Sequence, residues 1–264
     1  MPRAKRRLGQ HFLTDPGILA RIADALEAER DDAVLEIGPG PGTLTAALAA
    51  RAGRVVAIEK DRDLTGPLRL RFPEVEVIEG DALLLDWHAL MGGPFLVAGN
   101  IPYNITSPLL DKALLPPVPR RVVFLVQKEV AERVTGSPGS SAYGALSVGV
   151  QAVATAERLF TVPAGAFRPR PKVDSVVLRL RPREPPLISP SERDGFRAMV
   201  VGMFGFRRKQ LLRGIRELTG WTAEPSGERL RVAGVEPTAR PEALSPENFV
   251  RLYHSLVDGG WAPR

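Results

Sequence analysis

Four residues near the middle of the chain have the types and spacing of a pocket for a planar amine. Residues 100–103 read Asn-Ile-Pro-Tyr and directly follow an apolar run, 94–99, that is typical of a buried strand. The lone pair of an amino group on an aromatic ring, such as N6 of adenine, is delocalised, so the group is a weak nucleophile. If the Asn100 side-chain oxygen and the Pro102 carbonyl each accept one of its hydrogens, they favour a tetrahedral nitrogen whose lone pair faces an electrophile. Tyr103 would stack on the base.

The same four residues taken alone also fit a helix-capping Asn, a turn Pro and a half-buried Tyr. The elements around them therefore have to decide. The pattern before them is strand, glycine loop, helix: a strand at 34–37, the Gly-Pro-Gly-Pro-Gly loop 38–42, and Thr43 as the expected cap of the following helix. A second strand, 54–58, ends in Glu59, which suits the two ribose hydroxyls of a nucleoside. This arrangement fits NAD and other adenosine cofactors equally.

Further strands place more polar side chains at one edge of the predicted sheet. A third strand, 75–78, is followed by Asp81, which could accept a hydrogen bond from a cofactor adenine or simply cap a helix. A continuous apolar strand at 122–126 is typical of a sheet covered on both faces. The sequence predicts a parallel α/β sheet with every candidate functional residue at a strand's carboxyl end, where open α/β sheets bind ligands.

A proline-stiffened loop, 163–172, lies between two expected final strands, 154–162 and 173–180. It is predicted to expose Phe167 as a stacking surface for a base whose phosphates are held nearby; the alternative is a Phe buried under the loop. Its cations are Arg168, Arg170 and Lys172.

A boundary is expected near the Arg-Glu-Pro-Pro segment 183–186, beyond which the apolar spacing is helical. We predict a catalytic domain over 1–184 and a small all-α domain over 185–264. In the second helix of that domain, Lys209, Arg213 and Arg216 are predicted to form one cationic stripe.

Charge and composition narrow the class of protein. The chain has 264 residues, 44% of them hydrophobic, and a net charge of +6, which indicates an anionic partner such as nucleic acid. It has no cysteine, which excludes disulfides and thiolate chemistry, and its three histidines lack metal-ligand spacing. With no long apolar run and no signal-peptide pattern, a soluble intracellular protein is expected.

Cations cluster in two places: Arg3, Lys5, Arg6 and Arg7, and Arg207, Arg208, Lys209, Arg213 and Arg216. The Gln-His-Phe-Leu segment 10–13, beside the first cluster, is expected to dock on the protein rather than form a tail.

These features together resemble a known family, the ribosomal RNA adenine N6,N6-dimethyltransferases, and most closely its bacterial small-subunit (16S) members linked to kasugamycin sensitivity. The matching segments are 10–13, 36–42, 58–59, 80–82, 100–105, 167–175 and 206–209. The resemblance implies a class I, Rossmann-like methyltransferase fold with a seven-stranded, mostly parallel sheet and a helical C-terminal domain. It implies S-adenosylmethionine as cofactor and dimethylation of N6 on two adjacent adenosines near the 3′ end of 16S rRNA. A role in small-subunit biogenesis, as a cytoplasmic monomer that needs no metal and no membrane, follows from the same resemblance.

The resemblance also implies roles for single residues. His11 and Leu13 would close over the cofactor, His11 through its backbone because many relatives have Asn there. Asn100 would touch both cofactor and target, and the base would lie between Tyr103 and Phe167. The other implied cofactor contacts are Gly38, Gly40, Glu59 and Asp81, and the implied RNA contacts are Arg6, Arg7, Arg168, Arg170, Lys172, Arg207, Arg208, Lys209 and Arg213.

Two alternatives stay open at this point. A large-subunit RNA adenine methyltransferase that confers macrolide resistance shares the pocket, although the Thr-Ser-Pro-Leu-Leu segment 106–110 and the C-terminal Arg-Arg-Lys favour the small-subunit enzyme. A non-enzymatic RNA-binding assembly factor on the same fold would be expected to lose cofactor contacts, whereas Glu59, Asp81 and Asn100 are present. A nicotinamide dehydrogenase explains neither the segment 100–103 nor Phe167.

Overall fold

The computed structural model describes residues 4–5 and 8–263. The chain forms two compact units, one of Met1–Ala131 with Ala156–Pro182, the other of Glu132–Thr155 with Arg183–Arg264. The chain passes from the first unit to the second for the last time after Pro182, close to the boundary predicted after residue 184. The packing of Glu132–Thr155 with the C-terminal helices had no signal in the sequence.

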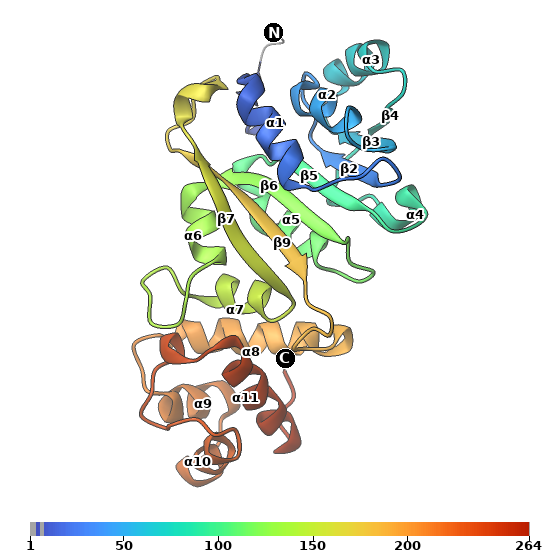
Figure 1. Ribbon diagram of the computed structural model, residues 1–264. Coiled ribbons are helices and arrows are strands. Elements are labelled where there is room, and N and C mark those ends of the chain that lie inside the picture. The colour runs from blue at the N-terminus through green and yellow to red at the C-terminus, as the bar shows by residue number, and fades with distance from the viewer. Residues whose placement is uncertain (1–3, 6–7, 264) are drawn as a thin grey trace. The chain divides into compact units, whose positions relative to one another are not determined.

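The first unit is built on a seven-stranded sheet with the order β4-β3-β2-β5-β6-β9-β7 (Figure 1). The first five strands in this order are parallel, and β9 runs antiparallel to β6. The predicted seven-stranded, mostly parallel sheet is therefore confirmed. The strands are β2 (Ala33–Ile37), β3 (Arg54–Glu59), β4 (Glu76–Glu79), β5 (Leu96–Asn100), β6 (Arg121–Gln127), β7 (Ala154–Val162) and β9 (Ser175–Pro182).

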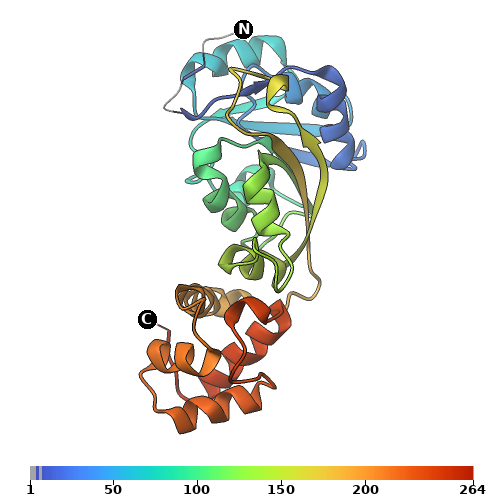
Figure 2. The same ribbon diagram turned by 90° about the vertical axis from the view of Figure 1, so that its left-hand side faces the viewer.

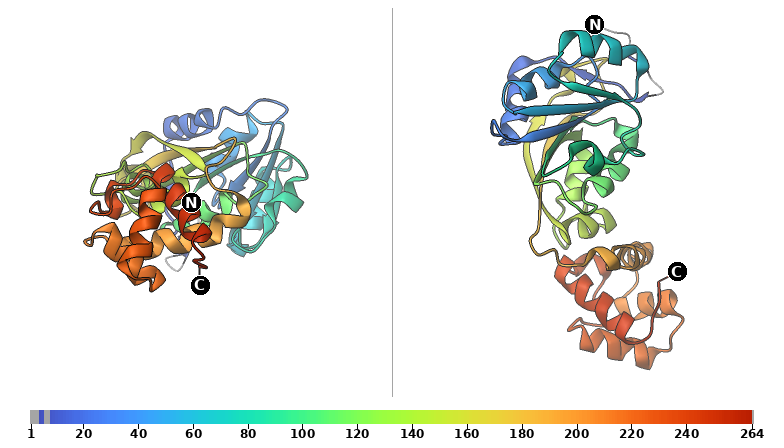
Figure 3. Two further views of the ribbon diagram at one scale, coloured as in Figure 1. Left: turned by 90° about the horizontal axis from the view of Figure 1, so that it is seen from below. Right: turned by 90° about the vertical axis from the view of Figure 1, so that its right-hand side faces the viewer.

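Helices cover both faces of this sheet, which is why its central strands are apolar on both sides (Figure 3). In β2, for example, the neighbouring residues Val34 and Leu35 point to opposite faces and are both fully buried. One face packs against α1 (Pro16–Ala25), α2 (Thr43–Ala49) and α3 (Arg62–Arg71). The other is covered by helices that include α4 (Trp87–Met91) and α5 (Thr106–Ala113); α6 (Lys128–Val134) follows β6.

A second, two-stranded sheet joins the N-terminal segment to the loop after β7. It pairs β1 (Phe12–Leu13) antiparallel with β8 (Phe167–Arg168), with Leu13 opposite Phe167. Phe12, Leu13 and Phe167 are buried in the main hydrophobic core. The prediction that segment 10–13 docks on the protein is confirmed.

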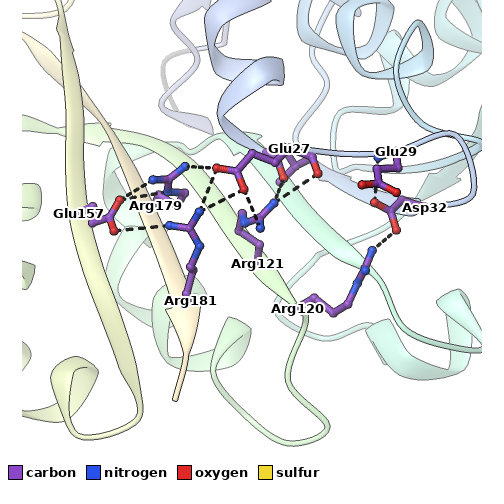
Figure 4. Close-up of polar contacts among 9 residues, drawn as sticks. Glu27, Glu29, Asp32, Arg120, Arg121, Glu157, Arg179 and Arg181 are labelled. Carbon is purple, nitrogen blue, oxygen red and sulfur yellow. Dashed lines mark hydrogen bonds and ion pairs between the residues drawn. The ribbon is translucent and has the colours of Figure 1, made fainter. Parts of the chain in front are cut away.

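An ion-pair network ties the end of α1 to the sheet edge formed by β6, β9 and β7 (Figure 4). The Glu27 carboxylate pairs with Arg121 at 2.8 Å, Arg179 at 2.6 Å and Arg181 at 2.9 Å. Glu157 on β7 pairs with the same two β9 arginines. Glu27 adopts a left-handed φ of +49°, which non-glycine residues rarely do. Its ion pairs hold the chain in this conformation just after α1 ends.

The second unit is helical (Figure 2). Its helices are α7 (Ala145–Gln151), α8 (Arg193–Gly205), α9 (Leu211–Thr219), α10 (Ala223–Val232) and α11 (Pro246–Asp258). Phe196, Met199 and Met203 of α8 recur at helical spacing and are at most 2% exposed, as their pattern predicts. No pattern in the sequence predicted α10. Lys209 lies in the turn before α9, so the prediction that it shares one helical stripe with Arg213 and Arg216 is wrong.

Candidate active site

A pocket opens at the carboxyl ends of the parallel strands and gathers most of the predicted site. It is formed by the glycine loop after β2, the ends of β3, β4 and β5, and the N-terminal segment that includes β1. Nine sequence-predicted residues line it: His11, Leu13, Gly38, Gly40, Glu59, Asp81, Asn100, Pro102 and Tyr103. Segments far apart in the sequence thus meet where this kind of sheet binds ligands.

The glycine loop brings the backbone itself to the pocket. Gly38 and Gly40 have φ of +67° and +59°, values that L side chains rarely adopt. No atom lies within 4 Å of where a Cβ of Gly38 would stand, so its backbone is open to a ligand. A Cβ on Gly40 would come within 3.0 Å of the Phe12 ring. The residue that caps α2 is Gly42, in a left-handed conformation, which makes the prediction for Thr43 wrong.

Glu59, the last residue of β3, is 5% exposed and fixed by backbone donors. Its Oε2 accepts the Gly40 amide at 3.0 Å and its Oε1 the Asp61 amide at 2.7 Å. Burial raises the pKa of Glu59, and the hydrogen bonds from these two amides oppose the rise. The carboxyl group therefore links the glycine loop to the end of β3 in a fixed orientation.

Asp81 lies after β4 and is held as a carboxylate. Its Oδ2 pairs with Lys60 at 2.6 Å, and its Oδ1 accepts the amide of Leu83 at 3.0 Å. The hydrogen bond from Lys60 lowers the pKa of Asp81. Because each carboxylate oxygen has two lone pairs, each can still accept a further hydrogen bond.

Glu36 is a polar lining residue that sequence reasoning did not assign a role. It belongs to β2, is 1% exposed, and its Oε2 has no hydrogen-bond partner in the described part of the chain. Burial raises the pKa of Glu36 to about 8, and the nearby Glu59 carboxyl adds to the rise. The signal that could have identified it is a single acidic residue inside an otherwise apolar strand.

Asn100 lines the pocket and is held by one hydrogen bond from its side-chain amide. Its Nδ2 donates to the His11 carbonyl at 2.8 Å. The Oδ1 atom makes no hydrogen bond with any residue that the structure describes. Tyr103, in a 3₁₀ turn just beyond β5, is oriented by a 2.9 Å hydrogen bond between its hydroxyl and Ser175 Oγ. Burial raises the Tyr103 pKa, so its hydroxyl stays protonated, and Ser175 is a supporting residue that the sequence did not point to.

The Pro102 carbonyl does not fit the predicted role of second acceptor. It already accepts the Ile105 amide at 3.1 Å, and the Thr106 hydroxyl, with its single hydrogen, lies 3.3 Å from both the Pro102 and the Tyr103 carbonyls. The Pro102 carbonyl is therefore engaged by the 3₁₀ turn Tyr103–Ile105 that leads into α5. The Ile101 carbonyl, next to Asn100, accepts no hydrogen bond from the described residues, and Ile101 lines the same pocket.

Phe167 is not the exposed aromatic that the sequence predicted. It is fully buried and packs in the main core, because the pairing of β8 with β1 turns its side chain inward. It does not line the pocket, and the alternative of a Phe buried under the loop is the one that the structure bears out.

The predicted RNA-binding cations differ in how free they are. Arg168, Arg170 and Lys172 are exposed, and Arg168 donates to the backbone carbonyls of Gly165 and Phe167. Arg208 is also exposed, whereas other cations of the second unit are in ion pairs: Arg207 with Glu242, and Lys209 and Arg213 with Glu217. Arg6 and Arg7 lie outside the described residues.

Among residues 4–5 and 8–263, no group of three or more His, Cys, Asp or Glu side chains is arranged to hold a metal ion. None of the helices in the same part of the chain combines the length and the apolar character needed to cross a membrane.

The profile of the family described as ribosomal RNA adenine dimethylase matches residues 1–258. The chain belongs to this family. The ribosomal RNA small subunit methyltransferase A of Bordetella avium is 41% identical over 260 residues, covering 97% of each chain. The protein of the same name from Thermosynechococcus vestitus is 45% identical over 266 residues, covering 97% of this chain and 98% of its own.

Solved structures of related proteins agree with this assignment. A dimethyladenosine transferase from Plasmodium falciparum superposes with a TM-score of 0.85 at 28% identity, covering 95% of this chain and 98% of that one. The 23S rRNA methyltransferase ErmE gives a TM-score of 0.74 at 32% identity, covering 93% and 99%. The expected class I, Rossmann-like methyltransferase fold with a helical C-terminal region is confirmed, as is the resemblance to the adenine dimethyltransferase family.

Proposed function

We propose that this member of the adenine dimethylase family transfers methyl groups from S-adenosylmethionine to N6 of two adjacent adenosines near the 3′ end of 16S rRNA. The observation that carries the proposal is the pocket in which Glu59 and Asp81 meet Asn100 and Tyr103. The first pair suits an adenosine cofactor and the second suits a target amino group. The relatives named for the small subunit, at 41% and 45% identity, favour this substrate over large-subunit RNA.

The pocket residues fit the cofactor as a set. The open backbone at Gly38 and the unpartnered oxygen of Glu36 suit its charged amino-acid part. Glu59 is positioned for the ribose hydroxyls and Asp81 for the adenine amino group, with Gly40, His11 and Leu13 completing the enclosure. When bound, S-adenosylmethionine supplies the electrophilic methyl group.

The chain's own contribution to the transfer is to position the amino group and localise its lone pair. Asn100 Oδ1 accepts one N6 hydrogen, because its Nδ2 is engaged with the His11 carbonyl. We assign the second acceptor to the Ile101 carbonyl in place of the Pro102 carbonyl. Two acceptors favour a tetrahedral nitrogen, and Tyr103 holds the base by stacking, which is worth about 1–3 kcal/mol.

The second methyl transfer sets a further demand on the same groups. After the first transfer N6 has one hydrogen, so one acceptor loses its partner and the pocket must accommodate a methyl group there. Asn100 Oδ1 belongs to a side chain that can adjust, whereas the Ile101 carbonyl is fixed by its neighbouring amide, which donates to Leu125 at 3.1 Å. We infer that the Ile101 carbonyl accepts the remaining N6 hydrogen and that the Asn100 side chain moves to make room for the methyl group.

RNA would be held mainly by the cations of the loop between β7 and β9. Arg168, Arg170 and Lys172 are exposed there and suit phosphate contacts. In the helical unit Arg208 is exposed, while Arg207, Lys209 and Arg213 would exchange an intramolecular carboxylate for a phosphate. Arg6 and Arg7 would add to this contact. We propose that the protein acts in the cytoplasm as a monomer during small-subunit biogenesis.

Methylation of separated ribosomal subunits tests the proposal. Small and large subunits that lack the modification are each incubated with the protein and labelled S-adenosylmethionine. Label in the small-subunit RNA alone supports the proposal, and label in the large-subunit RNA contradicts it. Tight binding to small subunits without any methyl incorporation would instead indicate a non-enzymatic assembly factor.

A further inference from the structure

One face of the Tyr103 ring is covered by a side chain of the protein itself. The imidazole of His11 stacks on the Tyr103 ring with 5.5 Å between ring centroids and 24° between planes. Its Nδ1 lies 2.8 Å from the Pro169 carbonyl, and because a carbonyl only accepts, Nδ1 carries the hydrogen. His11 is thus fixed against the aromatic ring that the proposed function assigns to the target.

The stacked pair also separates two cavities. One is the cofactor pocket, and the other is an open cleft whose lining includes the cations Lys5, Arg170 and Lys172 and the acids Asp61 and Asp63, both of which pair with Lys5. His11 and Tyr103 line both cavities, together with the neighbouring Gly9 and Gln10. A base whose phosphates are held by Arg170 and Lys172 would enter beside this pair.

A planar base does not fit between rings whose centroids are 5.5 Å apart, because stacking on both would need about 7 Å, twice the usual ring spacing. We propose that His11 is a positioning residue that occupies the Tyr103 face in the free protein and is displaced by the target adenine. This inference rests on the proposed function and adds to it the residue with which the target base competes.

The local structure allows the ring to leave while the backbone stays. On one side of His11, Phe12 and Leu13 are buried and paired with β8; on the other, Gln10 Nε2 donates to Asp61 Oδ2 at 3.0 Å. The His11 carbonyl remains available to Asn100 Nδ2 throughout. Rotation of the imidazole about its side-chain bonds breaks only the stack and the hydrogen bond to Pro169, and it exposes Tyr103 without moving Asn100.

The first arm of the test measures methyl transfer to unmethylated small subunits by His11→Ala and His11→Asn in single turnovers. Both variants remove the competing ring. Because His11 also lines the cofactor pocket, the assay is run at saturating S-adenosylmethionine, and we expect the half-saturating subunit concentration to fall about threefold to tenfold. His254→Ala, in the helical unit, is the matched control and should leave that concentration unchanged. An unchanged or raised half-saturating concentration would overturn the inference, since the ring would then be neutral or would help to hold the base.

The second arm uses the free protein and needs no methylation. In an NMR spectrum of the histidine-labelled wild type, the His11 ring protons should carry a ring-current shift that disappears in Tyr103→Leu. Absence of that shift would overturn the inference whatever the kinetics show. If instead the wild type transfers no methyl group to either subunit, the proposed function fails, while this arm still decides whether His11 covers Tyr103. Thermal melting of each variant shows whether it is folded.

Discussion

The cofactor side and the base side of the pocket are held by different kinds of contact. The cofactor side, Gly38, Gly40, Glu59 and Asp81, sits at strand ends, and its carboxylates are fixed by backbone amides or by Lys60. The base side, Tyr103 with His11 and the loop 163–172, is held by side chains that meet across distant segments. On the proposed function, this difference predicts a preformed cofactor site and a base site that changes when the substrate binds.

Asn100 lies where the two sides meet, and its loss should have the largest effect. Asn100→Ala removes the proposed N6 acceptor and the hydrogen bond to the His11 carbonyl. Loss of such a preorganised group costs roughly 10²–10³ in rate, so single-turnover methylation should fall by that factor. Asn248→Ala, in α11 and outside the pocket, is the control. If the rate of Asn100→Ala stays within about threefold of the wild-type rate, Asn100 does not have the proposed role as N6 acceptor.

On the cofactor side, Glu59→Gln should weaken cofactor binding without slowing the chemical step. The amide keeps the shape but replaces one acceptor by a donor that faces the Gly40 or Asp61 amide. A hydrogen bond to a charged group is worth about 1.5–3 kcal/mol, so KM for the cofactor should rise roughly 10- to 100-fold. Titration calorimetry with S-adenosylhomocysteine measures the binding directly. Equal losses in kcat and kcat/KM would contradict a purely binding role.

Removal of cations on the base side should change RNA binding and leave cofactor binding intact. Arg170→Ala and Lys172→Ala each delete one exposed charge from the cleft, so each should lower the slope of log K against log salt by about 1. Arg231→Ala, whose side chain pairs with Glu228 in the helical unit, serves as the comparison. Unchanged salt slopes in both loop variants would place the phosphate contacts elsewhere.

Glu36 provides the smallest expected effect, a pH-dependent change in the stability of the free protein. Its folded pKa of about 8 lies above the unfolded value of 4.5, so between these pH values the unfolded chain binds fewer protons than the folded one. Stability is therefore lost as pH rises through this window, by up to about 1.4 kcal/mol per pH unit. Glu36→Gln should remove this loss, and denaturant unfolding at several pH values measures it. Parallel stability profiles for wild type and variant would contradict a neutral buried Glu36.

The sequence predicted where Gly38, Gly40, Glu59 and Asp81 lie in the fold, because their placement depends on local pattern. A strand, a glycine loop and an acid at the next strand end follow one another along the chain, and parallel strands bring their carboxyl ends to one edge. The strand limits were close for the same reason; for example, the predicted strand 154–162 matches β7 (Ala154–Val162).

The base side was predicted less well because it depends on contacts between distant segments. Phe167 is buried only because β8 pairs with β1, more than 150 residues earlier in the chain, and no local pattern shows that pairing. The Pro102 carbonyl accepts the Ile105 amide in the turn that leads into α5. The Ser175 hydroxyl forms a hydrogen bond with Tyr103 from another strand. Neither the stack of His11 on Tyr103 nor the position of Lys209 before α9 follows from residue spacing.

The most direct test of the central claim is a nucleoside mass-spectrometry time course. Unmethylated small subunits are incubated with the protein and S-adenosylmethionine, and the RNA is digested at intervals. We expect N6,N6-dimethyladenosine as the final product in the small-subunit RNA, with N6-methyladenosine as a transient intermediate. Accumulation of N6-methyladenosine alone, or of no methylated adenosine, would contradict a pocket that presents the same nitrogen twice.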